Sequence, residues 1–199
     1  MTIQNYAPSS SDGRRARSER TRVAVAEAML DCLEEGVLRP AARDVAERAE
    51  VSTRAVFRHF DSMESLLEQV AELHHERVLC QLPPLALDGT REERVASLVA
   101  RTTRAFELTA AVRQAAVLVE PFSETIRSRH AWFRAEVRRG VRRALAEELE
   151  ALCETDRRIR IAGIRALISN SYWDELRTHE RLSVAAASRT LSEAIHALL

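Results

Sequence analysis

Apolar residues recur along this chain at the three- and four-residue spacing of an α-helix, and no long stretch alternates apolar and polar residues. The first such pattern covers about residues 17–35, where Leu30 and Leu33 belong to an apolar stripe. Gly36 follows at the position of a left-handed helix cap. A first helix that ends at residue 35 is therefore predicted.

Two short helices are predicted next, within residues 42–60, with a break at Glu50 and Val51. Val45 and Ala46 would be buried in the first helix, and Ser52 can cap the second. Short helices joined by a tight turn form a helix-turn-helix, whose second helix lies in the major groove of DNA. In the second helix, Val56, Phe57 and Phe60 are expected to face the core. In the first, Asp44 and Arg48 are spaced for an i,i+4 ion pair.

The remaining pattern predicts only more helices, separated by one clear break at residues 83–90, which contain Pro83, Pro84 and Gly89. They are expected over about residues 61–79, 92–109, 111–119, 123–153, 157–179 and 183–199. With five glycines, five prolines and 5% aromatic residues, the composition also favours an all-α chain.

Net charge is zero, so a nucleic-acid partner would have to bind a local basic patch. All 30 basic residues are arginine, and five of them lie between Gly13 and Arg22 beside a single glutamate. Residues 1–16 are therefore interpreted as a disordered basic arm, which either follows DNA or remains a solvated tail.

Several classes of protein are not supported by this sequence. The three cysteines, Cys32, Cys80 and Cys153, form no CxxC pair, and no secretory signal or membrane-length apolar run is present, so a cytoplasmic protein that contacts no membrane is expected. No Cys/His cluster, phosphate loop or nucleophile–base pair points to a metal, a cofactor or catalysis. We expect a protein that is not an enzyme.

Residues 42–60 resemble the DNA-binding signature of the TetR/AcrR family of bacterial transcriptional regulators. The resemblance extends to Glu34–Val37 before this segment and Phe60–Leu67 after it. It implies a three-helix DNA-binding domain over residues 17–62 and a helical ligand-binding and dimerisation domain over residues 63–199. It further implies a homodimer that binds a palindromic operator as a repressor and is released by a small-molecule effector. An activator, a ligand-independent regulator of the same fold and a non-specific DNA-binding protein remain alternatives.

By this resemblance, DNA contacts are expected from Arg17, Arg43, Ser52, Thr53, Arg54, Ala55, Phe57, Arg58 and His59. Arg54 would read a base, with guanine the first choice, or clamp a phosphate, and His59 would reach a phosphate. The chain departs from the family pattern at four places. The first of the two short helices lacks a capping serine or threonine, and Glu50 replaces the turn glycine. Phe57 replaces the usual tyrosine, and Met63 replaces a common lysine.

The family also implies a pocket and a dimer interface in the second domain. The pocket is expected where large side chains gather, with ordinary core packing as the alternative, at Phe106, Leu118, Phe122, Trp132, Phe133, Asn170, Tyr172 and Trp173. The interface, or otherwise an intramolecular core, is expected from the apolar stripes of the last two helices, at Ile164, Leu167, Ile168, Val184, Ala187, Leu191, Ala194, Ile195 and Leu198. The arginines at 134, 138, 139, 142 and 143 either attract an acidic ligand or form a solvated, salt-bridged face.

Overall fold

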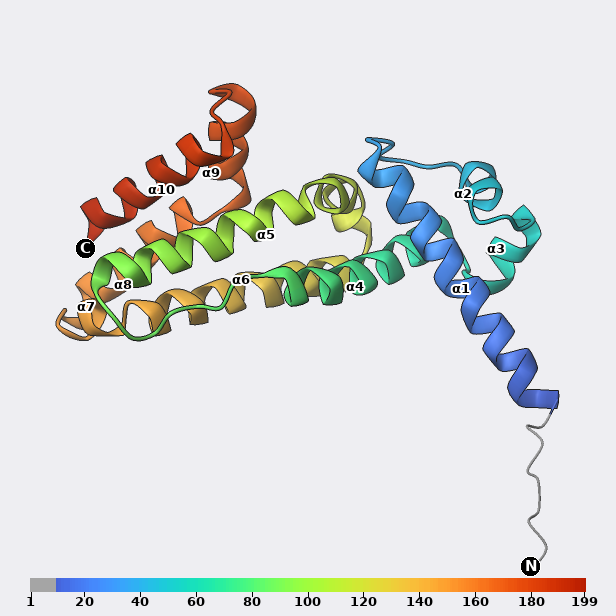
Figure 1. Ribbon diagram of the computed structural model, residues 1–199, viewed down its shortest axis with the longest axis horizontal. Helices are drawn as coiled ribbons and strands as arrows, with labels where there is room; N and C mark the ends of the chain where they lie inside the picture. The colour runs from blue at the N-terminus through green and yellow to red at the C-terminus, as the bar shows by residue number, and fades with distance from the viewer. Residues whose placement is uncertain (1–9) are drawn as a thin grey trace, which may run out of the picture. The chain divides into compact units, whose positions relative to one another are not determined.

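The computed structural model describes residues 10–199, and within them the chain forms helices joined by loops, with no strand (Figure 1). The all-α prediction is therefore confirmed. The contacts divide the chain into two compact units, one comprising residues 10–76 and 111–123, the other residues 77–110 and 124–199. Among the described residues, no helix combines the length and the apolar character needed to cross a membrane.

The first unit is built on α1 (Ser10–Glu34), against which α2 (Ala42–Arg48) and α3 (Thr53–His59) pack. The first part of α4 (Met63–Gln81), the end of α5 (Arg91–Val119) and the short 3-10 helix η1 (Glu120–Phe122) complete it. Its core contains the fully buried Val25, Leu33, Val45, Val56 and Leu66.

The first helix ends as the sequence predicts, since Gly36 has φ +90° and the amide of Val37 donates to the carbonyl of Cys32. Its beginning differs from the prediction. The helix starts at Ser10 and not at about residue 17, because each residue added to an existing helix costs little free energy. Residues 1–9 of the predicted arm lie outside the described part of the chain.

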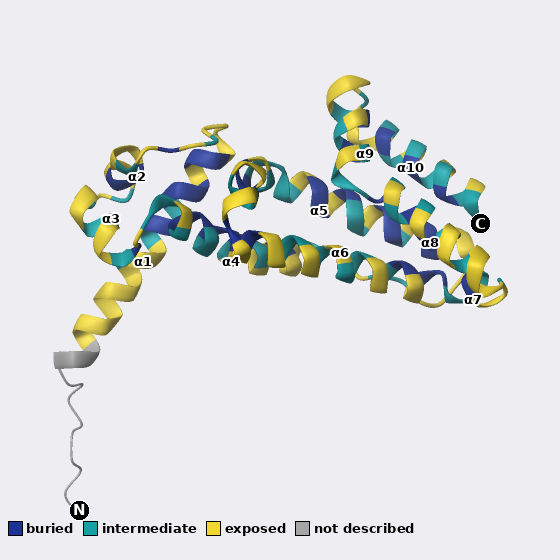
Figure 2. Cartoon of the chain, turned by 180° about the vertical axis from the view of Figure 1, so that it is seen from behind, coloured by how far each residue is buried: buried dark blue, intermediate teal, exposed yellow. Residues whose placement is uncertain are grey.

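The second unit contains most of α5, then α6 (Glu124–Ala144), α7 (Ala146–Glu150), α8 (Glu154–Leu167), α9 (Asn170–Asp174), the π-helical turn η2 (Glu175–His179) and α10 (Val184–Leu198). Figure 2 shows the buried faces of α8 and α10 in dark blue. The ring of Phe106 meets that of Trp173 at a centroid distance of 5.8 Å, and the indole N–H of Trp173 donates to Glu107 at 2.8 Å. These contacts join α5 to α9 within the core.

A buried arginine stabilises one end of this unit. Arg94 is only 3% exposed, and its guanidinium donates to the carbonyls of Gly89 at 2.7 Å and Ala144 at 2.9 Å and pairs with Glu148 at 2.5 Å. The charge is therefore fully partnered, as a buried cation requires.

Several predicted helices have different boundaries in the structure. The predicted helices over 92–109 and 111–119 are one helix, α5, because no glycine or proline interrupts residues 91–119. The predicted helices over 123–153 and 157–179 are each divided. Ser169 starts α9 by accepting a hydrogen bond from the amide of Tyr172, which a helix continuing from α8 would not allow.

Candidate DNA-binding helix-turn-helix

The turn between α2 and α3 depends on one residue in the left-handed region. Glu50 has φ +55°, and the next amide, that of Val51, donates to the carbonyl of Ala46 at 2.9 Å. This closes the end of α2 and redirects the chain toward α3. The glutamate that replaces the family's turn glycine therefore adopts a conformation that favours glycine.

Ser52 caps α3 as predicted. Its φ and ψ of −79° and 151° are those of an N-cap residue, and its hydroxyl oxygen accepts a hydrogen bond from the amide of Ala55 at 3.2 Å. Because the cap uses this hydroxyl oxygen as an acceptor, the main role of the Ser52 side chain is to start α3.

The two faces of α3 differ sharply. Val56 is fully buried and Phe60, at the end of α3, is 4% exposed, so these two side chains hold α3 against the rest of the unit. Phe57 is 49% exposed, and its expected place in the core is wrong. One residue after Val56, its side chain points about 100° away around the helix, which leaves it available for the expected DNA contact.

The exposed face of α3 carries the polar groups of the predicted site. Thr53, Arg54 and Arg58 are all exposed, and none of these three side chains makes a hydrogen bond or ion pair with the described residues 10–199. A guanidinium group in the first turn of a helix offers the planar fork that matches guanine or a phosphate. Ala55, whose amide donates to the capping hydroxyl of Ser52, is half-buried.

His59 is not placed for the phosphate contact that was expected of it. Its Nε2 atom is buried and has no hydrogen-bond partner among the described residues. A contact from this atom to a phosphate would require the side chain to change rotamer. The structure therefore separates His59 from the exposed group of Thr53, Arg54 and Arg58.

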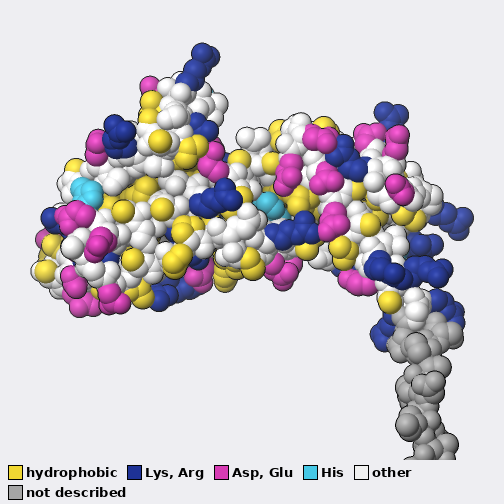
Figure 3. Space-filling view, viewed as in Figure 1, with side chains coloured by type: hydrophobic (Ala, Val, Ile, Leu, Met, Phe, Trp, Pro, Cys, Tyr) yellow, Lys and Arg dark blue, Asp and Glu magenta, His cyan; other side chains and the backbone are white. Residues whose placement is uncertain are grey.

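Further cations lie on α1 and α2 of the same unit. The side chain of Arg43 is 85% exposed and pairs with Asp44 at 3.0 Å. Arg17 is exposed near the start of α1. Figure 3 shows arginine side chains gathered over this part of the helix. Ala41 occupies the N-cap of α2 without a side-chain hydrogen bond, which confirms that this cap is missing.

The predicted ion pair between Asp44 and Arg48 is wrong. Arg48 instead donates two parallel hydrogen bonds to the carboxylate of Glu35, at 2.7 and 2.6 Å. A bidentate pair satisfies the guanidinium fork better than a neighbour on the same helix. These bonds join the end of α1 to the end of α2.

The large side chains predicted to line a ligand pocket occupy several environments. Phe106 and Trp173 form part of the core of the second unit, and Tyr172 packs against that core. Trp132 is 44% exposed and Phe133 half-buried, whereas Leu118 and Phe122 belong to the first unit and are 38% and 85% exposed. Asn170 is half-buried, and its Oδ1 has no partner among the described residues.

Most of the predicted dimer interface lies inside the chain's own core. The fully or almost fully buried members are Ile164, Ile168, Ala187, Leu191 and Ile195. Leu167 and Leu198 pack partly against that core. Val184, 39% exposed, and the half-buried Ala194 present more surface, and the stripe of α10 packs mainly on α8 of the same chain.

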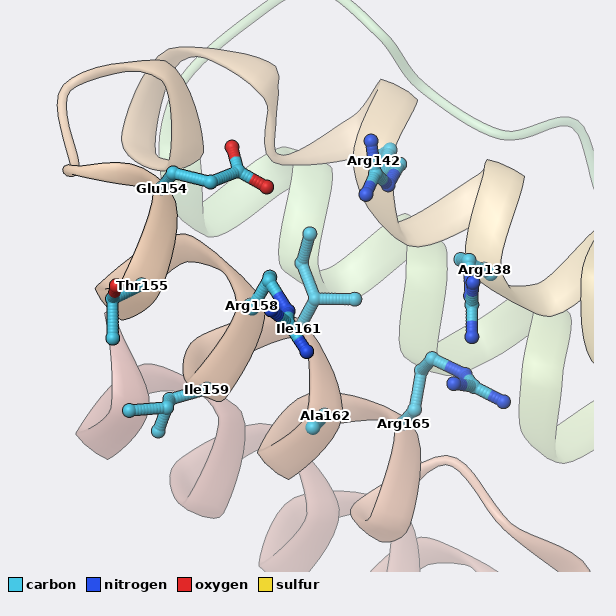
Figure 4. Close-up of a pocket in the computed structure, with 9 residues that line it drawn as sticks. All are labelled: Arg138, Arg142, Glu154, Thr155, Arg158, Ile159, Ile161, Ala162 and Arg165. Carbon is cyan, nitrogen blue, oxygen red and sulfur yellow. The ribbon is translucent and has the colours of Figure 1, made fainter.

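A groove between α6 and α8 in the second unit, lined largely by arginine and isoleucine, was not predicted from the sequence (Figure 4). The arginine pattern of α6 was the only signal of it. Among the described residues, no group of three or more His, Cys, Asp or Glu side chains could hold a metal ion.

Comparison with known proteins agrees with this geometry. Residues 33–70, which include α2, α3 and the start of α4, match the model of the bacterial regulatory proteins of the tetR family. A transcriptional regulator from Rhodococcus sp. Rha1 has a similar structure, with a TM-score of 0.66 and 17% identity over 92% of this chain and 95% of that one. A provisionally assigned transcriptional regulator from Pseudomonas aeruginosa PAO1 gives a TM-score of 0.63 and 19% identity over 90% of each chain. At these identities the two structures show a shared fold, and no curated protein matches the sequence.

Proposed function

Because this chain belongs to the tetR family of bacterial regulatory proteins, we propose that it is a homodimeric repressor that binds a short palindromic operator and is released by a small-molecule effector. The observation that supports this proposal most strongly is the exposed polar face of α3. Arg54 and Thr53 lie in the first turn, the part of a recognition helix that approaches base edges, while Val56 fixes the helix from behind.

The DNA-contacting groups have distinct roles in this proposal. Arg54 reads a base edge, and Arg58 and Arg43 contact phosphates on either side of the groove. Phe57 lies on the exposed face and contacts sugar or a thymine methyl group, since it lacks a hydroxyl group for a phosphate. Arg17 extends the basic surface along α1.

One recognition helix reads only a few base pairs, so a specific regulator needs two. Two copies related by a twofold axis would place their α3 helices in successive major grooves, roughly 34–36 Å apart. An effector that prefers a dimer with another spacing shifts the population away from the DNA-bound state. A coupling of ~1–3 kcal/mol between the two sites changes operator affinity by several-fold to ~150-fold.

The proposal is tested by selection from a random pool of double-stranded DNA with the purified protein at ~150 mM salt. Enrichment of a palindrome by the wild-type protein, and not by Thr53→Ala/Arg54→Ala, is expected. Binding without enrichment that vanishes as salt rises would indicate a non-specific DNA-binding protein instead. Once an operator is known, its position relative to a promoter separates a repressor from an activator.

A further inference from the structure

The groove between α6 and α8 has a volume of about 650 Å³ and lies wholly within the second unit. Two arginines of α6 line one side, and residues spread along α8 from Glu154 to Arg165 line the other (Figure 4). Arg138 and Arg142 are one helical turn apart, about 6 Å along the axis, and Arg158 and Arg165 are two turns apart, about 10 Å. The four guanidinium groups therefore border a single concave surface.

These four arginines lack the partners that neighbouring arginines have. Arg139 pairs with Glu136 and Arg157 with Glu154, on the same two helices. None of the four groove arginines makes an ion pair or hydrogen bond with any residue in the described range 10–199. The one acidic residue in the lining is Glu154, which is already paired with Arg157. The groove thus has an excess of positive charge that the chain does not neutralise.

Apart from Thr155, the rest of the lining is apolar. Ile161 is 5% exposed and forms part of the core, whereas Ile159 is 66% exposed and offers apolar surface to an occupant of the groove. Ala162 lies one helical turn from Arg158 and Ile159 and belongs to the same lining. An occupant that matches this surface needs both anionic and apolar parts.

We propose that the groove binds a small amphipathic anion, whose carboxylate or phosphate group is held by the arginines and whose apolar part covers Ile159 and Ala162. Its volume lies within the range of small-molecule sites, roughly 300–1,000 Å³. A concave site of this size suits a small molecule better than the flat face that a second copy would present. That such an anion acts as the effector rests on the proposed function; the binding itself does not.

The test uses two variants that remove the same charge from α6. Arg138→Gln/Arg142→Gln changes the groove, and Arg134→Gln/Arg143→Gln changes exposed arginines of α6 outside its lining. Octanoate and octyl phosphate are titrated calorimetrically into each full-length protein, with octylammonium as the cationic control. Thermal melts establish that both variants remain folded.

At least one of the two anions is expected to bind the wild-type protein and the control variant equally. The groove variant should bind it about tenfold more weakly or worse, because two charge-assisted hydrogen bonds are lost. Binding of octanoate alone or of octyl phosphate alone would support the proposal and identify the head group.

Absence of binding by both anions, or an equal loss in both variants, would overturn the proposal. So would a groove variant that sediments as a monomer while neither anion binds the wild-type protein, because a second copy would then occupy the groove. Operator binding is measured on the same preparations. If no anion binds but the operator still does, only this inference is overturned. If an anion binds but no operator does, only the proposed function is overturned.

Discussion

Arg54 is the side chain on which the proposed base reading depends most. It is exposed in the first turn of a helix that begins at a capped serine and is fixed by the fully buried Val56. A guanidinium group held this way can donate to two acceptors on one guanine. The contribution of Arg54 to base preference should therefore be confined to one base pair in each half-site.

Arg54→Ala should weaken operator binding by ~1–3 kcal/mol and relax the preference at one position of each half-site. Fluorescence anisotropy with the operator and its single-base variants measures both effects. Arg134→Ala, which removes an exposed arginine from α6, serves as the control and should change neither. An equal loss on every DNA sequence would identify Arg54 as a phosphate contact instead.

Glu50 carries backbone strain in the turn that orients α3. Its φ of +55° lies in a region that disfavours residues with a Cβ, by roughly 1–2 kcal/mol. Glu50→Gly should therefore raise the free energy of unfolding by about 0.5–1 kcal/mol, after the greater flexibility of glycine in the unfolded chain is subtracted. Thermal denaturation measures the change.

The control for this prediction is Glu47→Gly, three residues earlier and exposed within α2. There glycine should destabilise the protein by about 1 kcal/mol, because the backbone is helical. If Glu50→Gly destabilised the protein to the same extent, the strain assigned to Glu50 would be absent.

Among the helices, α1 and α2 are joined by a contact that depends on pH. Hydrogen bonds from Arg48 hold the pKa of the Glu35 carboxyl below its ordinary value of 4.5, and partial desolvation opposes this shift only in part. A carboxyl group whose pKa is lowered by folding stabilises the folded state above its unfolded pKa and loses that contribution as the pH falls through the folded one. This contact should therefore weaken below about pH 4.5.

Glu35→Gln should lower the urea midpoint of unfolding relative to the wild-type protein at pH 7, and the difference should shrink at pH values well below 4.5. Glu34→Gln, at an exposed neighbouring position, should leave the midpoint unchanged at both pH values. If the urea midpoints of the wild-type protein and Glu35→Gln differed by the same amount at every pH, the ion pair would not stabilise the contact between α1 and α2.

The sequence predicted the helix-turn-helix well because its signals are local. The cap at Ser52, the left-handed Glu50 and the stop at Gly36 each depend on residues within one helical turn. The division at Ser169 was missed because periodicity continues across a short break, and a serine there also fits a continuous helix.

The candidate site in the second unit was harder to predict for a different reason. Helical periodicity shows that Leu191 and Ile195 share one apolar face, but it does not show whether the same chain or a partner covers that face. In the structure the chain covers it. The arginine groove requires two helices that are separate in sequence, so the pattern of α6 alone left a ligand site and a solvated face as alternatives.

For the whole molecule, the proposed dimer must use the part of α10 that remains exposed. Leu191 is fully buried, so a charged residue there would unfold the second unit and reveal nothing about an interface. Ala194 is only half-buried and adjoins the buried stripe, which makes it the better position for a test.

Ala194→Glu should leave the protein folded, convert the dimer to a monomer and abolish tight operator binding. Sedimentation measures the first change and DNA titration the second. Ala151→Glu adds the same charge at an exposed position outside α10, at the end of α7, and should retain the dimer. A dimer that persists in Ala194→Glu would exclude this part of α10 from the interface.

The central claim is that α3 makes this chain a sequence-specific DNA-binding regulator. It is tested most directly by titrating the wild-type protein with its selected palindrome and with the same duplex after both half-sites are scrambled, at ~150 mM salt. Affinity for the palindrome should exceed that for the scrambled duplex by at least ~1,000-fold. Equal affinities that fall together as the salt concentration rises would contradict sequence-specific recognition and leave only electrostatic attraction to phosphates.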